Sequence, residues 1–121
     1  MYDGKVHSAY YPRYGAGYVT RLQSVVNGEM VIYQDFHMQK DRLTAPGTVV
    51  KAGDIIGYQG DSGNLQAAIR SGGVDSHVHI KFSKYNGNGD YNNYNNYIET
   101  DPVTYFGSTF TETGTSNNDC N

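Results

Sequence analysis

Glycine- and asparagine-containing turns divide this chain into short runs of β-branched and aromatic residues. The clearest example is the segment Tyr18–Phe36, in which Asn27-Gly28 separates two such runs. An Asn-Gly pair between apolar runs is typical of a two-residue β-hairpin, because both positions of that turn need a positive φ. The pattern therefore predicts a hairpin over Tyr18–Phe36 and a fold built mainly from antiparallel strands.

Three further segments refine this prediction. Val49–Val50 leads into a turn at Lys51–Asp54, and Ile55–Tyr58 is predicted to be a buried strand. Asn64–Arg70 is the best candidate for a helix. We therefore expect an all-β or mostly β fold class, with antiparallel sheets in a small open barrel or sandwich and a short helical insert near residues 64–71.

Length and local composition predict the domain organisation. The 121 residues fit one domain, since single domains typically contain about 100–150 residues. We predict this domain over residues 1–110, and a disordered tail over the polar residues 111–121.

The Tyr/Asn-rich segment 85–97 has neither a helical nor a strand period, so we expect a long loop whose polar and aromatic surface suits contact with glycan or peptide. Apolar residues in Asp101–Phe106 are expected to anchor the end of the chain.

Charge, hydropathy and cysteine content argue against several classes of protein. The formal net charge of −3 gives no indication of nucleic-acid binding. No apolar run is long enough to predict a membrane span, and no signal-peptide pattern is present at the start of this chain. Because Cys120 is the single cysteine, we expect neither a disulfide nor a cysteine-based metal site in the core.

The sharpest local motif is His77-Val78-His79. Residues i and i+2 of a strand point to the same face, so both imidazoles should project side by side, with Lys81 on the same face. Val78, Ile80 and Phe82 should form the apolar face opposite. Such a pair can supply one metal ligand with a general base beside it, or two ligands to one zinc ion. The alternative is a half-exposed strand on which both histidines are ordinary polar residues.

A second candidate group lies near the end of the predicted hairpin. Alternation along this strand places Tyr33, Asp35 and His37 on one face. In such a site the carboxylate can orient an imidazole, and the tyrosine can donate a hydrogen bond to a developing oxyanion. The alternative is again a solvated strand face.

Several motifs follow one another over roughly residues 3–106. They are Tyr14–Val19, Tyr33–Met38, Gly47–Gly57, Gly60–Gly63, Ser76–Ile80 and Asp101–Phe106. This order and spacing resemble the lysostaphin-type zinc metallopeptidases, the M23 family. The resemblance implies an antiparallel β fold with a groove and one zinc ion. It further implies an enzyme that cleaves short peptide bonds of bacterial peptidoglycan through a zinc-activated water. It also implies a location in the cell envelope or outside the cell.

The resemblance assigns a role to each site residue. His79 corresponds to a zinc ligand, and His77 and His37 correspond to the two catalytic histidines. Tyr33 and Asp35 remain possible supporting residues.

In the family, the other two zinc ligands form a His-x-x-x-Asp motif upstream of a strand that corresponds here to Asp3–Val6. We therefore expect the C-terminal part of a longer peptidase, an N-terminally incomplete domain whose missing ligands can also come from an associated chain. Asp3 and His7 have the reverse order and are poor substitutes. The alternative function is a degenerate, metal-free domain that binds cell-wall peptide or glycan, or mediates protein interaction. A carrier domain modified at Lys51 is a third class, weakly indicated by its Gly-Asp turn.

Overall fold

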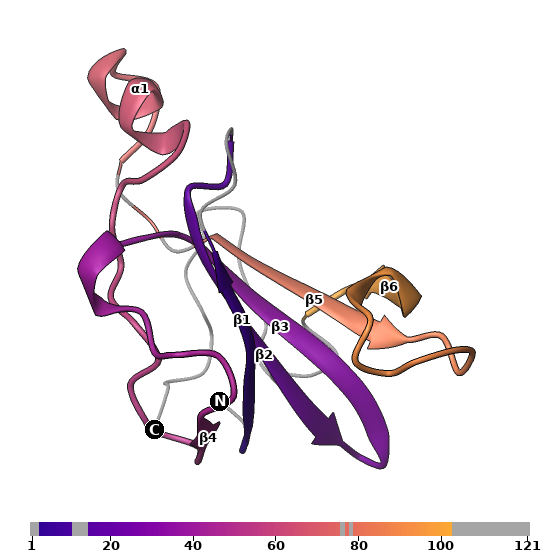
Figure 1. Ribbon diagram of the computed structural model, residues 1–121. Coiled ribbons are helices and arrows are strands. Elements are labelled where there is room, and N and C mark those ends of the chain that lie inside the picture. The colour runs from indigo at the N-terminus through magenta and orange to yellow at the C-terminus, as the bar shows by residue number, and fades with distance from the viewer. Residues whose placement is uncertain (1–2, 11–14, 76, 78, 103–121) are drawn as a thin grey trace.

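The computed structural model describes residues 3–10, 15–75, 77 and 79–102. Its strands form a six-stranded antiparallel sheet in the order β4-β1-β2-β3-β5-β6 (Figure 1). The strands are β1 (Gly4–Tyr10), β2 (Tyr18–Val26), β3 (Glu29–Met38), β4 (Val49–Val50), β5 (His79–Tyr85) and β6 (Tyr97–Thr100). The predicted mostly β fold class is confirmed, in the form of a single open sheet.

The hairpin predicted from Asn27-Gly28 is formed by β2 and β3. Both turn residues have a positive φ, 52° at Asn27 and 80° at Gly28. These values are those of the tight turn whose twist matches that of the flanking strands. The hairpin places β2 and β3 at the centre of the sheet, next to β5 (Figure 1).

One face of the sheet carries the hydrophobic core. The buried cluster consists of Val6, Leu22, Val26, Val31, Tyr33, Val50 and Phe82. Ile56 and Ile80 pack against this cluster and are partly buried. In β5, Ile80 and Phe82 therefore point to the core while His79 and Lys81 occupy the other face, as their alternation predicted.

In the part of the chain that the structure describes, helices are short. The predicted insert is confirmed as helix α1 (Leu65–Arg70), and two 3-10 helices, η1 (Lys40–Arg42) and η2 (Tyr94–Asn96), lie in connections. Among the described residues, no helix is long and apolar enough to cross a membrane.

The strand predicted at Ile55–Tyr58 is wrong. Ile55 is 66% exposed and Tyr58 is 40% exposed. The segment runs beside the chain that follows β3, with Gln39 N donating to Tyr58 O at 2.9 Å and Thr44 N donating to Ile56 O at 3.1 Å. These bonds are too widely spaced for a ladder. The apolar run is therefore a loop, followed by one isolated bridge between Met38 and Gln59, and of this run only Ile56 packs against the core.

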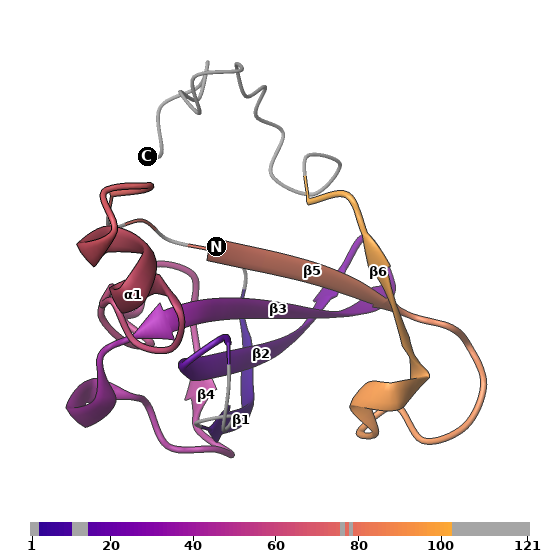
Figure 2. The ribbon, with the colours of Figure 1, turned by 90° about the horizontal axis from the view of Figure 1, so that it is seen from above.

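The Tyr/Asn-rich segment connects β5 and β6 through η2 (Figure 2). Its asparagines explain its shape, because their side chains close successive turns. The Asn86 carboxamide oxygen accepts from Asn88 N at 2.8 Å, and the Asn93 oxygen accepts from Asn95 N at 3.0 Å. The segment also reaches β1, where His7 Nε2 donates to Asn92 O at 2.7 Å. The predicted tail, 111–121, and the larger part of the predicted anchor lie outside the described residues.

Candidate functional site

Three imidazoles gather where the end of β3 meets the start of β5. The ring of His37 lies 5.7 Å from that of His79 and 6.1 Å from that of His77, measured between centroids. Phe36 packs edge-on against His79 at 4.8 Å. The structure thus brings together the two histidines of the His-x-His motif and the histidine at the end of the hairpin.

A β-bulge at the end of β3 aims His37 into this cluster. Tyr18 pairs with Met38 and Thr20 pairs with Asp35, so β3 carries one more residue than β2 between these pairs. His37 has a φ of 60°, a left-handed conformation that is uncommon outside glycine. The bulge breaks the alternation that placed His37 on the same face as Asp35, and turns its side chain toward His79.

Hydrogen bonds fix the tautomers of two of the rings. Nδ1 of His37 lies 2.8 Å from the carbonyl oxygen of Ser62, and Nδ1 of His77 lies 2.8 Å from that of Asp75. Because a carbonyl oxygen only accepts, each Nδ1 carries the proton. In the neutral form of each ring, Nε2 is then left with a free lone pair.

The surroundings of His79 favour the neutral form of its ring. Partial burial lowers its pKa, and the nearby His37 and His77 lower it further through charge repulsion. Its ring has no hydrogen-bond partner among the described residues. A ring nitrogen of His79 is therefore available to act as a base or as a metal ligand.

Two glycine-containing turns, residues 15–17 and 60–63, pack together and hold His37. His37 N donates to Ala16 O at 2.8 Å, and Asn64 N donates to Gly15 O at 2.8 Å. A Cβ atom on Gly17 would collide with Ser62, and one on Gly63 would collide with the backbone of Gly15. Glycine at these positions permits an approach that other residues would block.

Ser62 joins the two turns to the end of β3. Its hydroxyl donates to Met38 O at 2.7 Å and accepts from Tyr18 N at 2.9 Å. The local sequence pattern did not predict this role for Ser62, although the residue lies in one of the motifs that carry the family resemblance.

Removing the Ser62 hydroxyl is expected to destabilise this corner of the fold. In Ser62→Ala both hydrogen bonds are lost, and the free energy of unfolding should fall by about 1–3 kcal/mol. Ser71→Ala is the matched control, because the Ser71 hydroxyl makes a single exposed bond to Ala68 O, and it should change stability by less than about 0.5 kcal/mol. Urea titration of both variants measures the difference; equal losses would contradict the bridging role.

Tyr33 and Asp35 form a pair of their own on the core face. The Tyr33 hydroxyl donates to Asp35 Oδ1 at 2.6 Å, and the Tyr33 ring packs edge-on against Phe82 at 6.0 Å. Burial and the neighbouring carboxylate raise the pKa of Tyr33, which keeps its hydroxyl protonated. Burial raises the pKa of Asp35 from 3.8 to about 6, although the hydrogen bond from Tyr33 opposes this change. Neither side chain lines the pocket that contains His37 and His79.

Asp35 is expected to make stability depend on pH. Because its pKa is higher in the folded protein, its stabilising contribution is present near pH 4 and is lost as the pH rises through about 6. The unfolding free energy of the wild type relative to Asp35→Asn should therefore fall by about 2 kcal/mol between pH 4 and pH 7. Urea titrations of both proteins across this range test the prediction, and parallel pH profiles would contradict it.

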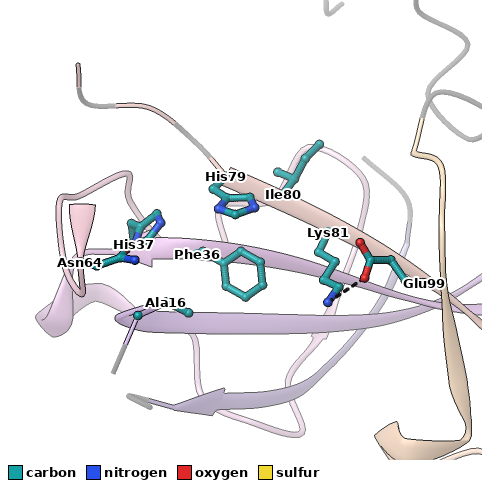
Figure 3. A pocket seen from close by; sticks show the side chains of 9 residues that line it. Ala16, Phe36, His37, Asn64, His79, Ile80, Lys81 and Glu99 are labelled. Carbon is teal, nitrogen blue, oxygen red and sulfur yellow. Dashed lines mark ion pairs between the residues drawn. The ribbon is translucent and has the colours of Figure 1, made fainter. Parts of the chain in front are cut away.

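His37 and His79 line a pocket of about 380 Å³ on the sheet face opposite the core (Figure 3). His37 and Asn64 lie at one end of this pocket, with Phe36 and His79 beside them. At the other end, Lys81 Nζ forms an ion pair with Glu99 Oε2 at 2.9 Å. The alternation of β5 predicted Lys81 on the same face as His79, whereas nothing in the sequence indicated Glu99.

The zinc ion implied by the family resemblance finds only part of a site in the described residues. Within the ranges that the structure covers, no group of three or more His, Cys, Asp or Glu side chains can hold a metal ion. Zinc sites use at least three protein ligands, so the described residues do not hold zinc by themselves. His79 can serve as one ligand.

No family model and no curated protein matches the sequence. Among solved structures, the fold is similar to that of the catalytic domain of the antimicrobial peptidase lysostaphin from Staphylococcus simulans. The TM-score is 0.56 at 23% identity, over 87% of this chain and 65% of that one. A structure of LytU is similar with a TM-score of 0.52 at 24% identity, over 86% of this chain and 59% of the other. This chain therefore shares their fold and spans less than two thirds of the length of either.

Proposed function

We propose that this domain takes part in hydrolysing short peptide bonds of bacterial peptidoglycan, at the pocket formed around the three histidines. The observation that carries the proposal is the convergence of His37, His77 and His79 beside a pocket. The fold supports it, because the catalytic domain of the peptidase lysostaphin has a similar one. The substrate class and the proposed location, in the cell envelope or outside the cell, both come from the family resemblance.

His37 and His77 are proposed as the catalytic histidines. Each presents Nε2 with a free lone pair, since Nδ1 is held by a backbone carbonyl. A neutral imidazole of this kind can accept a proton from water, and the imidazolium can then donate to an oxyanion or to the leaving amine. The fixed Nδ1 bonds orient each ring for this exchange.

His79 is proposed as a zinc ligand. The other ligands of that zinc site have to come from residues outside the described ranges or from a second, associated chain. Tyr33 and Asp35 act at most indirectly, by shaping the strand from which His37 projects.

The proposal is tested by incubating purified peptidoglycan with the protein in zinc-containing buffer and measuring newly formed amino groups. We expect release by the wild type and at least about a 100-fold lower rate for His77→Ala, since a lost general acid–base group costs about 10²–10⁴-fold. His7→Ala is the matched control, because the His7 ring, on β1, bonds to the Asn92 carbonyl, whereas the His77 ring lies beside that of His37. Equal rates for His77→Ala and wild type, or no release by the wild type, would contradict the proposal.

A metal-free binding domain is the second candidate function. It is favoured by the lack of a three-ligand group among the residues that the structure describes. It predicts that protein treated with a chelator still binds peptidoglycan fragments, with heat measurable by calorimetry, and releases no amino groups. Loss of all binding after chelation would exclude it.

A further inference from the structure

Arg21 is a preorganised cation on the same sheet face as the histidines. Its guanidinium lies between two aromatic rings, 3.7 Å from the centroid of Tyr94 and 4.7 Å from that of Tyr10. Its Nε donates to Gln34 Oε1 at 2.9 Å, and its Nη2 donates to the Tyr10 hydroxyl at 2.9 Å. Gln34 is itself held by the Tyr94 hydroxyl, to which its Nε2 donates at 2.6 Å. The side chain is therefore fixed before any ligand arrives.

Within the described part of the chain, the partners of the Arg21 charge are neutral. Among the described residues, no carboxylate pairs with it, and its Nη1 donates no hydrogen bond. The residue is partly exposed. A guanidinium clamped between rings, with unused donors at its edge, is suited to bind a carboxylate with little further loss of side-chain entropy.

Strand register connects Arg21 to the pocket. Arg21 pairs with Gln34 and Gln34 pairs with Lys81, so these residues form one row across β2, β3 and β5. The next row on the same face is Phe36 with His79. Two residues along a strand span roughly 7 Å, so the Arg21 row lies roughly 7 Å from the histidine row. Lys81 belongs to the Arg21 row and also lines the pocket.

From this arrangement we propose that Arg21, with Lys81 beside it, binds a carboxylate of the peptide whose backbone occupies the histidine pocket. The inference rests on the proposed function and adds a specificity for substrates. The scissile bond would lie at the histidines, and the carboxylate would lie about two to three residues away along an extended peptide. The exposed Lys81–Glu99 pair is weak enough to yield to such a ligand, since Glu99 is 66% exposed.

The test is an NMR titration with three acetylated Gly/Ala tetrapeptides: a C-terminal acid, the corresponding amide, and an amide that carries one glutamate. Binding is followed by the imidazole signals of His37 and His79. We expect the acid or the glutamate peptide to bind at least about 10-fold more tightly than the plain amide, as hydrogen bonds to charged groups allow. The arm with the tighter binding identifies the carboxylate as terminal or side-chain.

Variants separate recognition from support of the loop. Arg21→Gln should reduce the preference for a carboxylate to less than about 2-fold, whereas Arg70→Gln, an exposed residue on α1, should retain it. Tyr94→Phe keeps the ring over Arg21 but loses the hydroxyl that holds Gln34, so the preference should fall less than in Arg21→Gln. If Arg21→Gln does not fold, the comparison of the acid and the amide with the wild type still shows whether the site prefers a carboxylate.

Equal binding of all three peptides at the histidines would overturn the role of Arg21 and leave the proposed function intact. If no peptide shifts the imidazole signals, the proposed function and this inference both fail.

Discussion

The variant His37→Asn is expected to lose peptide cleavage by at least about 100-fold while remaining folded. Asparagine tolerates the left-handed φ of 60° at this position. Its carboxamide NH₂ can also donate to the Ser62 carbonyl, as Nδ1 of His37 does. The substitution therefore removes Nε2, the atom to which we assign proton transfer, and keeps the supporting bond.

Two readouts are needed for His37→Asn. The rate of amino-group release from peptidoglycan reports on catalysis, and urea titration reports on stability, which should change by less than about 1 kcal/mol. His37→Ala is the companion variant: it loses the same Nε2 and also the bond to Ser62, so it should be less stable at a similar loss of rate. A wild-type rate in a folded His37→Asn protein would contradict the role of His37.

The second large effect is expected for Gly63→Ala, which should lower the free energy of unfolding by at least about 3 kcal/mol. Gly63 has a φ of 73°, and an added Cβ would collide with the backbone of Gly15 and Gly17. These atoms cannot move freely, because Gly15 O accepts from Asn64 N at 2.8 Å and Ala16 O accepts from His37 N at 2.8 Å.

Gly47→Ala is the matched control for Gly63→Ala. Gly47 has a φ of 88°, and an added Cβ would meet nothing within 4 Å. It therefore reports the cost of the left-handed backbone alone, about 1–2 kcal/mol. Urea unfolding of both variants isolates the contact between the two turns. If Gly63→Ala loses no more stability than Gly47→Ala, the packing of these turns does not hold the site.

Local signals were sufficient to predict the framework of the sheet. Asn27-Gly28 predicted the hairpin because turn chemistry is decided by adjacent residues, and the alternation of Ile80 and Phe82 predicted the core face of β5. Ile55–Tyr58 was predicted wrongly for the same reason. Its composition favours a strand, but strand formation depends on partners elsewhere in the chain. In the structure, the backbone hydrogen bonds of this segment are too far apart to form a strand ladder.

The arrangement of the site depended on features without a local signal. A bulge in β3 turns His37 away from Asp35, and period-two alternation cannot anticipate an extra residue. The contact of Tyr94 with Arg21 joins residues far apart in the chain through a loop whose path the sequence did not indicate. The family resemblance grouped His37, His77 and His79, and the structure brings these three side chains together.

Peptidoglycan digestion in H₂¹⁸O tests the central claim most directly. A peptidase adds the elements of water across the bond it cleaves, so each new carboxyl group should carry one ¹⁸O atom, detected by mass spectrometry of the released peptides. We predict labelled peptide fragments from the wild type and none above background from His37→Asn and His77→Ala. Unlabelled, uncleaved peptides from the wild type, or equal labelling by all three proteins, would contradict hydrolysis at the three-histidine pocket.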